Sequence, residues 1–153
     1  MNRVRILVVV LLSLFAGAAY AGAWGVSSLS NDDALDFLQL LEDEPSQGLV
    51  YGTLQSIAST KGYVEAPDGA YGIAAAEMVA AMLGNPSPEL FEPISGWASR
   101  QGRPPRKYVE LALDALTVVE NTDVSELAQL FAEDAELFAE WRASVNELRS
   151  RLQ

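Results

Sequence analysis

Ile-Ala-Ala-Ala-Glu-Met-Val-Ala-Ala-Met-Leu, residues 73–83, is an alanine-rich apolar stretch that carries one charge, Glu77. The sequence Gly-Asn-Pro at 84–86 stops a helix, and Pro67 suits the first turn of one. These signals predict a helix over residues 67–83. A helix that is apolar on all sides is buried on all sides, and alanine lets neighbouring helices approach closely. We therefore expect this segment to be the central helix of the domain.

Segments with helical periodicity lie on both sides of the central one. In the last segment, apolar residues follow at spacings of 3, 4, 3 and 4 from Phe138 to Leu152, which fits one face of a helix. The other expected helices cover residues 30–44, 46–60, 93–101, 105–121 and 124–131, and the last covers 134–152. No segment has the pattern of a strand, and there is no internal repeat. The sequence predicts an all-α fold, an irregular bundle of five to seven helices.

Two local pairs mark expected helix ends. Ser30 is the expected N-cap of the first helix, with Asp33 three residues later as the acid of a capping box. Near the C-terminus, Glu147 and Arg151 are four residues apart in the order that stabilises a helix by a few tenths of a kcal/mol.

The N-terminus has the three parts of a secretory signal peptide. Arg3 and Arg5 form a positive region, an apolar run covers 6–19, and Ala19-Tyr20-Ala21 has small residues where a signal peptidase cuts. We expect a signal peptide at 1–21, a single helical domain at 22–153, and a protein that is periplasmic or secreted.

The alternative is an uncleaved membrane anchor through residues 6–23. No charge occurs between Ile6 and Asn31. This segment is long enough to span a bilayer, which requires about 20 residues in a helix. Glycine and alanine crowd the end of this run, where a stable anchor would continue with leucine, isoleucine or valine. This composition favours cleavage, which would leave no stable membrane anchor.

Charge and missing residue types limit the possible functions. The chain has 21 acidic and 10 basic residues, and removing Arg3 and Arg5 with the signal peptide changes the net charge from −11 to −13. Such a surface repels nucleic acid and anionic membranes and attracts a basic protein partner. The chain has no histidine and no cysteine, which excludes Ser-His-Asp and Cys-His catalysis and ordinary zinc sites. We predict no catalytic residue, no metal and no cofactor.

Glu77 is the most informative single residue. Its helical neighbours Ile73, Ala74, Ala80 and Ala81 are all apolar, so an unpaired carboxylate there would be desolvated. It could be a tuned acid or ligand-binding group, or it could lie on a solvated stripe between small residues. The interpretation we favour is a structural acceptor for backbone N–H groups or for the indole N–H of Trp24.

Asn31, Asp32 and Asp36 are the second candidate. Asp32 and Asp36 share a helix face, and paired carboxylates can bind a cation or transfer protons. The simpler interpretation is helix capping and compensation of the helix dipole. A composite site with Glu77 would require Glu77 near the start of the first helix. The candidate polar cluster is Glu77, Asp32, Asp36, Asn31 and Trp24, for which we favour a structural role.

Aromatic and basic residues allow two further interpretations. Trp24, Trp97 and Trp141 could stack on sugars or peptides, but their apolar surroundings favour core packing. Four basic residues between Arg100 and Lys107 could bind an anion, although a loop among acidic neighbours is the simpler interpretation.

Several blocks resemble one bacterial family. They are Gly-Ala-Trp-Gly at 22–25, Asn-Asp-Asp-Ala-Leu-Asp-Phe at 31–37, 74–81 with Trp97, 109–116, and Trp-Arg to Leu at 141–148. Together they are similar to the uncharacterised domain of unknown function 4259. The resemblance implies a fold for nearly all of the mature chain and no activity. This chain differs from the family pattern in that an export signal precedes the Trp-Gly motif.

Three functions remain open at this point. The favoured one is a non-enzymatic, exported, acidic helical domain that binds a protein or small ligand, as an inhibitor or immunity protein does. The alternatives are a carboxylate-based hydrolase of the cell envelope and a structural envelope component.

We expect the exported protein to begin at Gly22. Mass spectrometry of the mature chain tests this directly, because cleavage removes the residues up to Ala21. A chain recovered with its N-terminal segment intact would contradict cleavage and support the anchor.

Overall fold

The fold over residues 25–153 is all-α, as expected. In this computed structural model those residues form seven helices and no strand, while the predicted signal peptide at 1–21 and Trp24 lie outside the described residues. The helices are α2 (Asp32–Asp43), α3 (Gln47–Ala58), α4 (Ala66–Met82), α5 (Ile94–Arg100), α6 (Arg106–Val119), α7 (Glu126–Ala132) and α8 (Ala135–Arg151). Within the described part, no helix combines the length and apolar character needed to cross a membrane.

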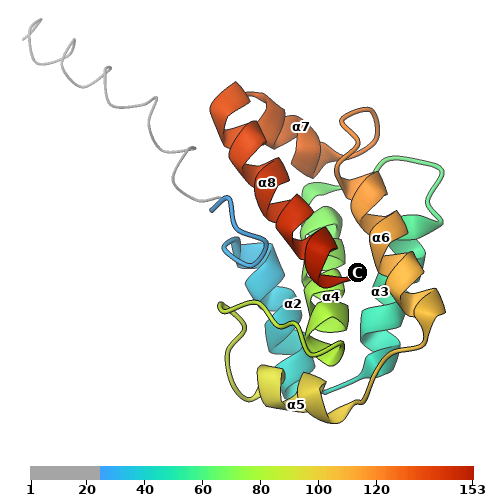
Figure 1. The fold of residues 1–153 in the computed structure, drawn as a ribbon. Helices are drawn as coiled ribbons and strands as arrows, with labels where there is room; N and C mark the ends of the chain where they lie inside the picture. Colours follow the sequence, from blue (N-terminus) through green and yellow to red (C-terminus); the bar gives the residue numbers. More distant parts are fainter. Residues whose placement is uncertain (1–24) are drawn as a thin grey trace, which may run out of the picture.

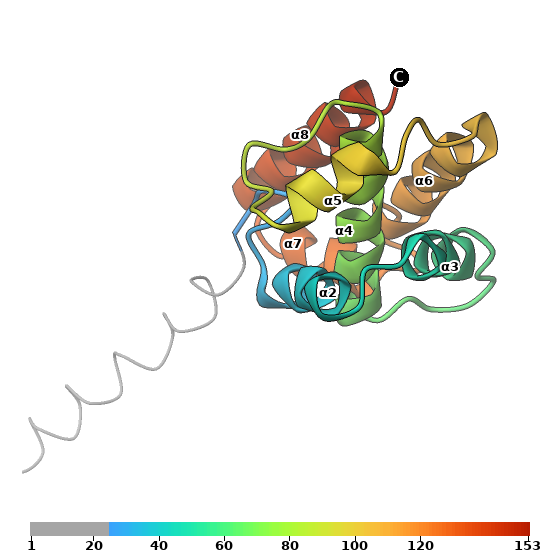
Figure 2. The same ribbon diagram turned by 90° about the horizontal axis from the view of Figure 1, so that it is seen from below.

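Helix α4 is the centre of the molecule, as its composition predicts. It packs against each of the other six helices, which surround it in Figures 1 and 2. Fourteen of its 17 residues are buried. Helix α7 comes especially close, because a Cβ added at Gly69 would lie 3.2 Å from the Cβ of Leu127. Small residues on α4 therefore allow a full ring of helices around it.

The predicted helix ends agree with the structure to within a few residues, with one correction at the start of α2. Asn31, and not Ser30, is the N-cap: its side-chain oxygen accepts a hydrogen bond from the backbone N–H of Ala34 at 2.7 Å. Ser30 lies in the preceding turn, where its hydroxyl oxygen accepts from the backbone N–H of Ser27 at 3.1 Å. Both residue types can cap a helix, and the turn before α2 decides between them.

The apolar residues that the sequence predicts on one face of α8 pack in the core. Trp141 is buried and stacks with two aromatic rings, with its centroid 4.9 Å from that of Phe131 and 5.9 Å from that of Phe138. Trp97 on α5 is half-buried against the same core. These two tryptophans therefore contribute to packing, as their surroundings predict.

The start of α4 is held by the first residue of α7. The Glu126 carboxylate accepts a hydrogen bond from the backbone N–H of Ala66 at 2.8 Å, which satisfies one of the free donors at the start of the helix. A single parallel bridge joins Val64 and Ser125 beside it. Two loops far apart in sequence are thereby fixed side by side.

Candidate functional site

Glu77 lies fully buried in the middle of α4. Its two carboxylate oxygens accept hydrogen bonds from the Arg151 guanidinium, at 2.7 Å from Nη1 and 2.6 Å from Nη2. The buried Ser28 hydroxyl donates to the same carboxylate. Two parallel bonds from one guanidinium are the strongest pairing a carboxylate can form with a side chain. The burial rules out the solvated stripe among our three interpretations of this residue.

Arg151 is itself held on several sides. Its side chain is 14% exposed, and its Nε donates to the Glu147 carboxylate at 2.8 and 2.9 Å, which is the helical pair that the sequence predicts. Asn85 adds two bonds, accepting from Nη1 at its backbone carbonyl and donating its side-chain amide to the carbonyl of Arg151. Burial lowers the pKa of this guanidinium, but hydrogen bonds with Glu77 and Glu147 more than compensate, so that its pKa is raised.

Segments from both ends of the described chain meet at this carboxylate. Ser28 precedes α2, and Arg151 is the last residue of α8. The same two segments are joined a second time, since the Ser144 hydroxyl of α8 donates to the backbone carbonyl of Val26 at 2.6 Å. Glu77 therefore joins the segment before α2, the central helix and the end of α8.

Of the other residues in the predicted polar cluster, Asn31, Asp32 and Asp36 form no hydrogen bond with Glu77, and Trp24 lies outside the described residues. Asn31 is buried as the cap of α2, whereas Asp32 and Asp36 are exposed. Glu77 takes its bonds from Ser28 and Arg151 and not from either aspartate. Over residues 25–153, no three acidic side chains come together in a way that could hold a metal ion.

A second ion pair was not predicted from the sequence. Glu120, at the end of α6, accepts from Arg149 Nη2 at 2.6 Å and from its Nε at 3.0 Å. Arg149 also donates to the carbonyl of Leu113, and Arg142 approaches Glu120 at 3.8 Å. This network joins α6 to α8. Arginines that border the apolar stripe of the last helix were the signal that could have indicated both ion pairs.

Two of the four residues in the predicted basic cluster, Arg106 and Lys107 at the start of α6, have partners within the described chain. Arg106 pairs with Glu110 at 2.8 Å, with its side chain 91% exposed. The Lys107 ammonium lies 4.7 Å from the centroid of the Tyr108 ring, and that ring stacks on Tyr51 at 3.6 Å. These contacts favour the simpler interpretation of the cluster, in which its charges lie on a surface segment.

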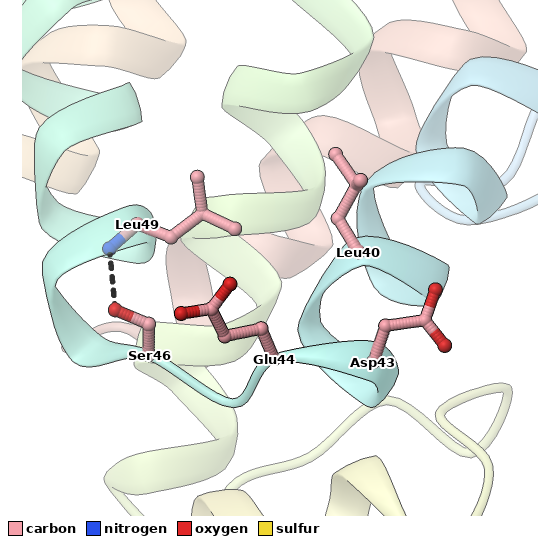
Figure 3. A pocket seen from close by; sticks show the side chains of 5 residues that line it. All are labelled: Leu40, Asp43, Glu44, Ser46 and Leu49. Atoms are coloured by element: carbon pink, nitrogen blue, oxygen red, sulfur yellow. Dashed lines mark hydrogen bonds between the residues drawn. The ribbon is translucent and has the colours of Figure 1, made fainter.

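A surface cleft lies between the end of α2 and the start of α3. It has a volume of about 390 Å³ and is lined by Leu40, Asp43, Glu44, Ser46 and Leu49. Figure 3 shows Leu40 and Leu49 on its two sides, with the Glu44 carboxylate below Leu49 and Asp43 turned away. The Ser46 hydroxyl accepts from the backbone N–H of Leu49 at 3.2 Å and so caps α3. This cap fixes the short connection that forms the floor of the cleft.

The chain around α2 carries unbalanced negative charge. No lysine or arginine occurs between residues 25 and 60, and none of the acidic residues there forms an ion pair with any residue in 25–153. Those acidic residues are Asp32, Asp33, Asp36, Glu42, Asp43 and Glu44. Their mutual repulsion is evident at Asp33, where burial raises the pKa of the carboxyl and the Asp36 and Asp32 carboxylates raise it further.

Removing the partner of Glu77 should strongly destabilise the protein. We expect Arg151→Met to lower the free energy of unfolding by about 3–5 kcal/mol, because it leaves a buried carboxylate without its cation. Arg106→Met is the matched control, since it removes an exposed ion pair and should cost less than about 1 kcal/mol. Urea unfolding of both variants measures the difference. Equal losses would show that the Glu77 pair contributes no more than a surface ion pair.

Comparison with known proteins gives one match. No curated protein and no solved structure matches the chain. A family model described as "Domain of unknown function (DUF4259)" matches residues 22–144. The matched region contains Glu77 and the whole of α2, and it ends before Glu147 and Arg151. Since the match covers most of the chain and confirms the resemblance of its motifs, the protein belongs to the DUF4259 family.

Proposed function

We propose that this protein is a non-enzymatic, exported domain that binds a basic protein partner, as an inhibitor or immunity protein does. The observation that carries the proposal is the large excess of acidic side chains that have no cation within the domain. The carboxylate that looked most suited to chemistry, Glu77, is meanwhile neutralised internally by Arg151.

The distribution of ion pairs supports this proposal. Residues 25–153 contain all 21 acidic residues and eight of the basic ones. Only four acidic residues take part in ion pairs within this part of the chain, namely Glu77, Glu110, Glu120 and Glu147. Seventeen others have no such partner there. Summed charge of one sign steers an oppositely charged protein towards the surface and speeds association.

A carboxylate-based hydrolase receives less support. Glycoside hydrolysis needs two carboxyl groups facing each other across a cleft, about 5–9.5 Å apart. The cleft beside α2 contains Asp43 and Glu44, which are consecutive residues, and Asp43 is turned away from the gap (Figure 3). Glu77 has no access to solvent. A purely structural envelope role has no specific observation in its favour.

Export is the second part of the proposal and rests on residues 1–21. A partner in the periplasm or outside the cell would meet the mature domain after the signal peptide is removed. Cleavage would also remove Arg3 and Arg5, which increases the negative charge presented to that partner.

The test is affinity capture from cell-envelope extract, with the purified protein as bait. At about 0.01 M salt, where the Debye length is about 30 Å, we expect enrichment of proteins with a basic isoelectric point. Washing at about 1 M salt should release them, because screening removes the steering attraction. An unrelated acidic helical protein of similar net charge serves as the control bait. If no basic protein is retained at low salt beyond that control, the proposed function is wrong.

A further inference from the structure

The cleft between α2 and α3 combines exposed apolar surface with unpaired acidic groups. Leu40 is 47% exposed on one side of it, and the half-buried Leu49 lies on the other. The Glu44 carboxylate lies below Leu49 in Figure 3 and also lines the cleft. The volume of the cleft, about 390 Å³, is at the small end of the range for ligand pockets, about 300–1,000 Å³. The cleft is therefore suited to a small apolar group with a cation beside it.

The end of α2 is electrostatically unfavourable in the isolated chain. A helix C-terminus carries partial negative charge and is stabilised by cations. Here the last turn of α2 has no basic residue, and Glu42, Asp43 and Glu44 follow one another at that end. No lysine or arginine within residues 25–153 forms an ion pair with any of these three. A cation supplied from outside would balance both the carboxylates and the helix end.

From these observations we infer that the α2–α3 cleft is the docking site for the basic partner. The partner presents an apolar side chain that enters between Leu40 and Leu49. A lysine or arginine next to it pairs with Glu44 at the end of α2. This inference rests on the proposed function and specifies the surface and the partner segment that it requires.

The net charge of the chain favours a basic partner in the cleft over a second copy of the chain. Two copies would each carry a net charge of −11, or −13 after loss of Arg3 and Arg5, and would repel one another. A basic segment is attracted by the same charges. The cap that Ser46 provides to α3 orders the start of that helix, which lines the cleft.

The chain offers a matched control for the apolar contact. Leu35 lies on the same helix and is 43% exposed, close to the value for Leu40. The two are five residues apart, which turns their side chains roughly 140° from each other around the helix. Leu35 therefore has similar exposure but lies on the opposite flank of α2, away from the cleft.

The experiment is a titration of ¹⁵N-labelled protein followed by NMR, with two synthetic peptides of lysine and glycine. One peptide has a central leucine and the other has serine at that position. We expect the leucine peptide to shift the amide signals of Leu40, Glu44 and Leu49 and to bind roughly fivefold more tightly than the serine peptide. Leu40→Ser should weaken binding of the leucine peptide by roughly fivefold, whereas Leu35→Ser should change it by less than about twofold.

The possible failures can be told apart. Equal binding of both peptides, or shifts that cluster away from α2 and α3, would overturn the docking site and leave the proposed function standing. No binding of either peptide at about 0.01 M salt would count against the proposed function as well. Shifts at the cleft that depend on protein concentration without peptide would assign it to a second copy and overturn the inference.

Discussion

The buried carboxylate of Glu77 constrains the rest of this structure. An ionised group in the middle of an apolar helix needs a cation and further hydrogen bonds to be tolerated. Arg151 supplies the cation and Ser28 a hydrogen bond. Because these two residues come from opposite ends of the described chain, balancing one charge requires the start of the domain and the end of α8 to pack on α4. The ring of helices around α4 is thereby closed by a polar contact.

Two of the eight basic residues in 25–153, Arg149 and Arg151, are partly buried in internal ion pairs, which adds to the acidic character of the surface. Arg151 neutralises Glu77, and Arg149 with Arg142 neutralises Glu120 at the end of α6. The other six basic residues are exposed but are outnumbered by unpaired acidic residues, and none of them lies along the chain around α2. The acidic residues at the end of α2 therefore have no ion-pair partner within residues 25–153. The proposed function follows from this division of charge and not from a catalytic group.

Local patterns predicted the helices because helix formation depends on neighbours in the sequence. The spacing from Phe138 to Leu152 identifies α8, and the apolar run at 73–83 identifies the central helix. Which of two neighbouring residues caps a helix was harder to predict. The sequence favoured Ser30 as the N-cap of α2, whereas the structure has Asn31.

Contacts between residues far apart in the sequence could not be predicted from the sequence patterns. The apolar neighbours of Glu77 indicated that it would need a partner, but Arg151 is 74 residues away, and periodicity does not specify such a pairing. The predicted pair of Arg151 with Glu147 is present as well, and it occupies a different edge of the same guanidinium. The cleft was also not predicted, because the exposure of Leu40 depends on how α3 follows α2.

The central claim is that Glu77 and Arg151 stabilise the fold as a pair. Urea unfolding of Glu77→Leu, Arg151→Met and the double variant tests it most directly, because a double-mutant cycle isolates the interaction between two residues. We predict that the double variant recovers about 2–4 kcal/mol relative to the sum of the two single losses, since apolar side chains can replace a buried ion pair. Losses that simply add would contradict the claim and show that the two residues act independently.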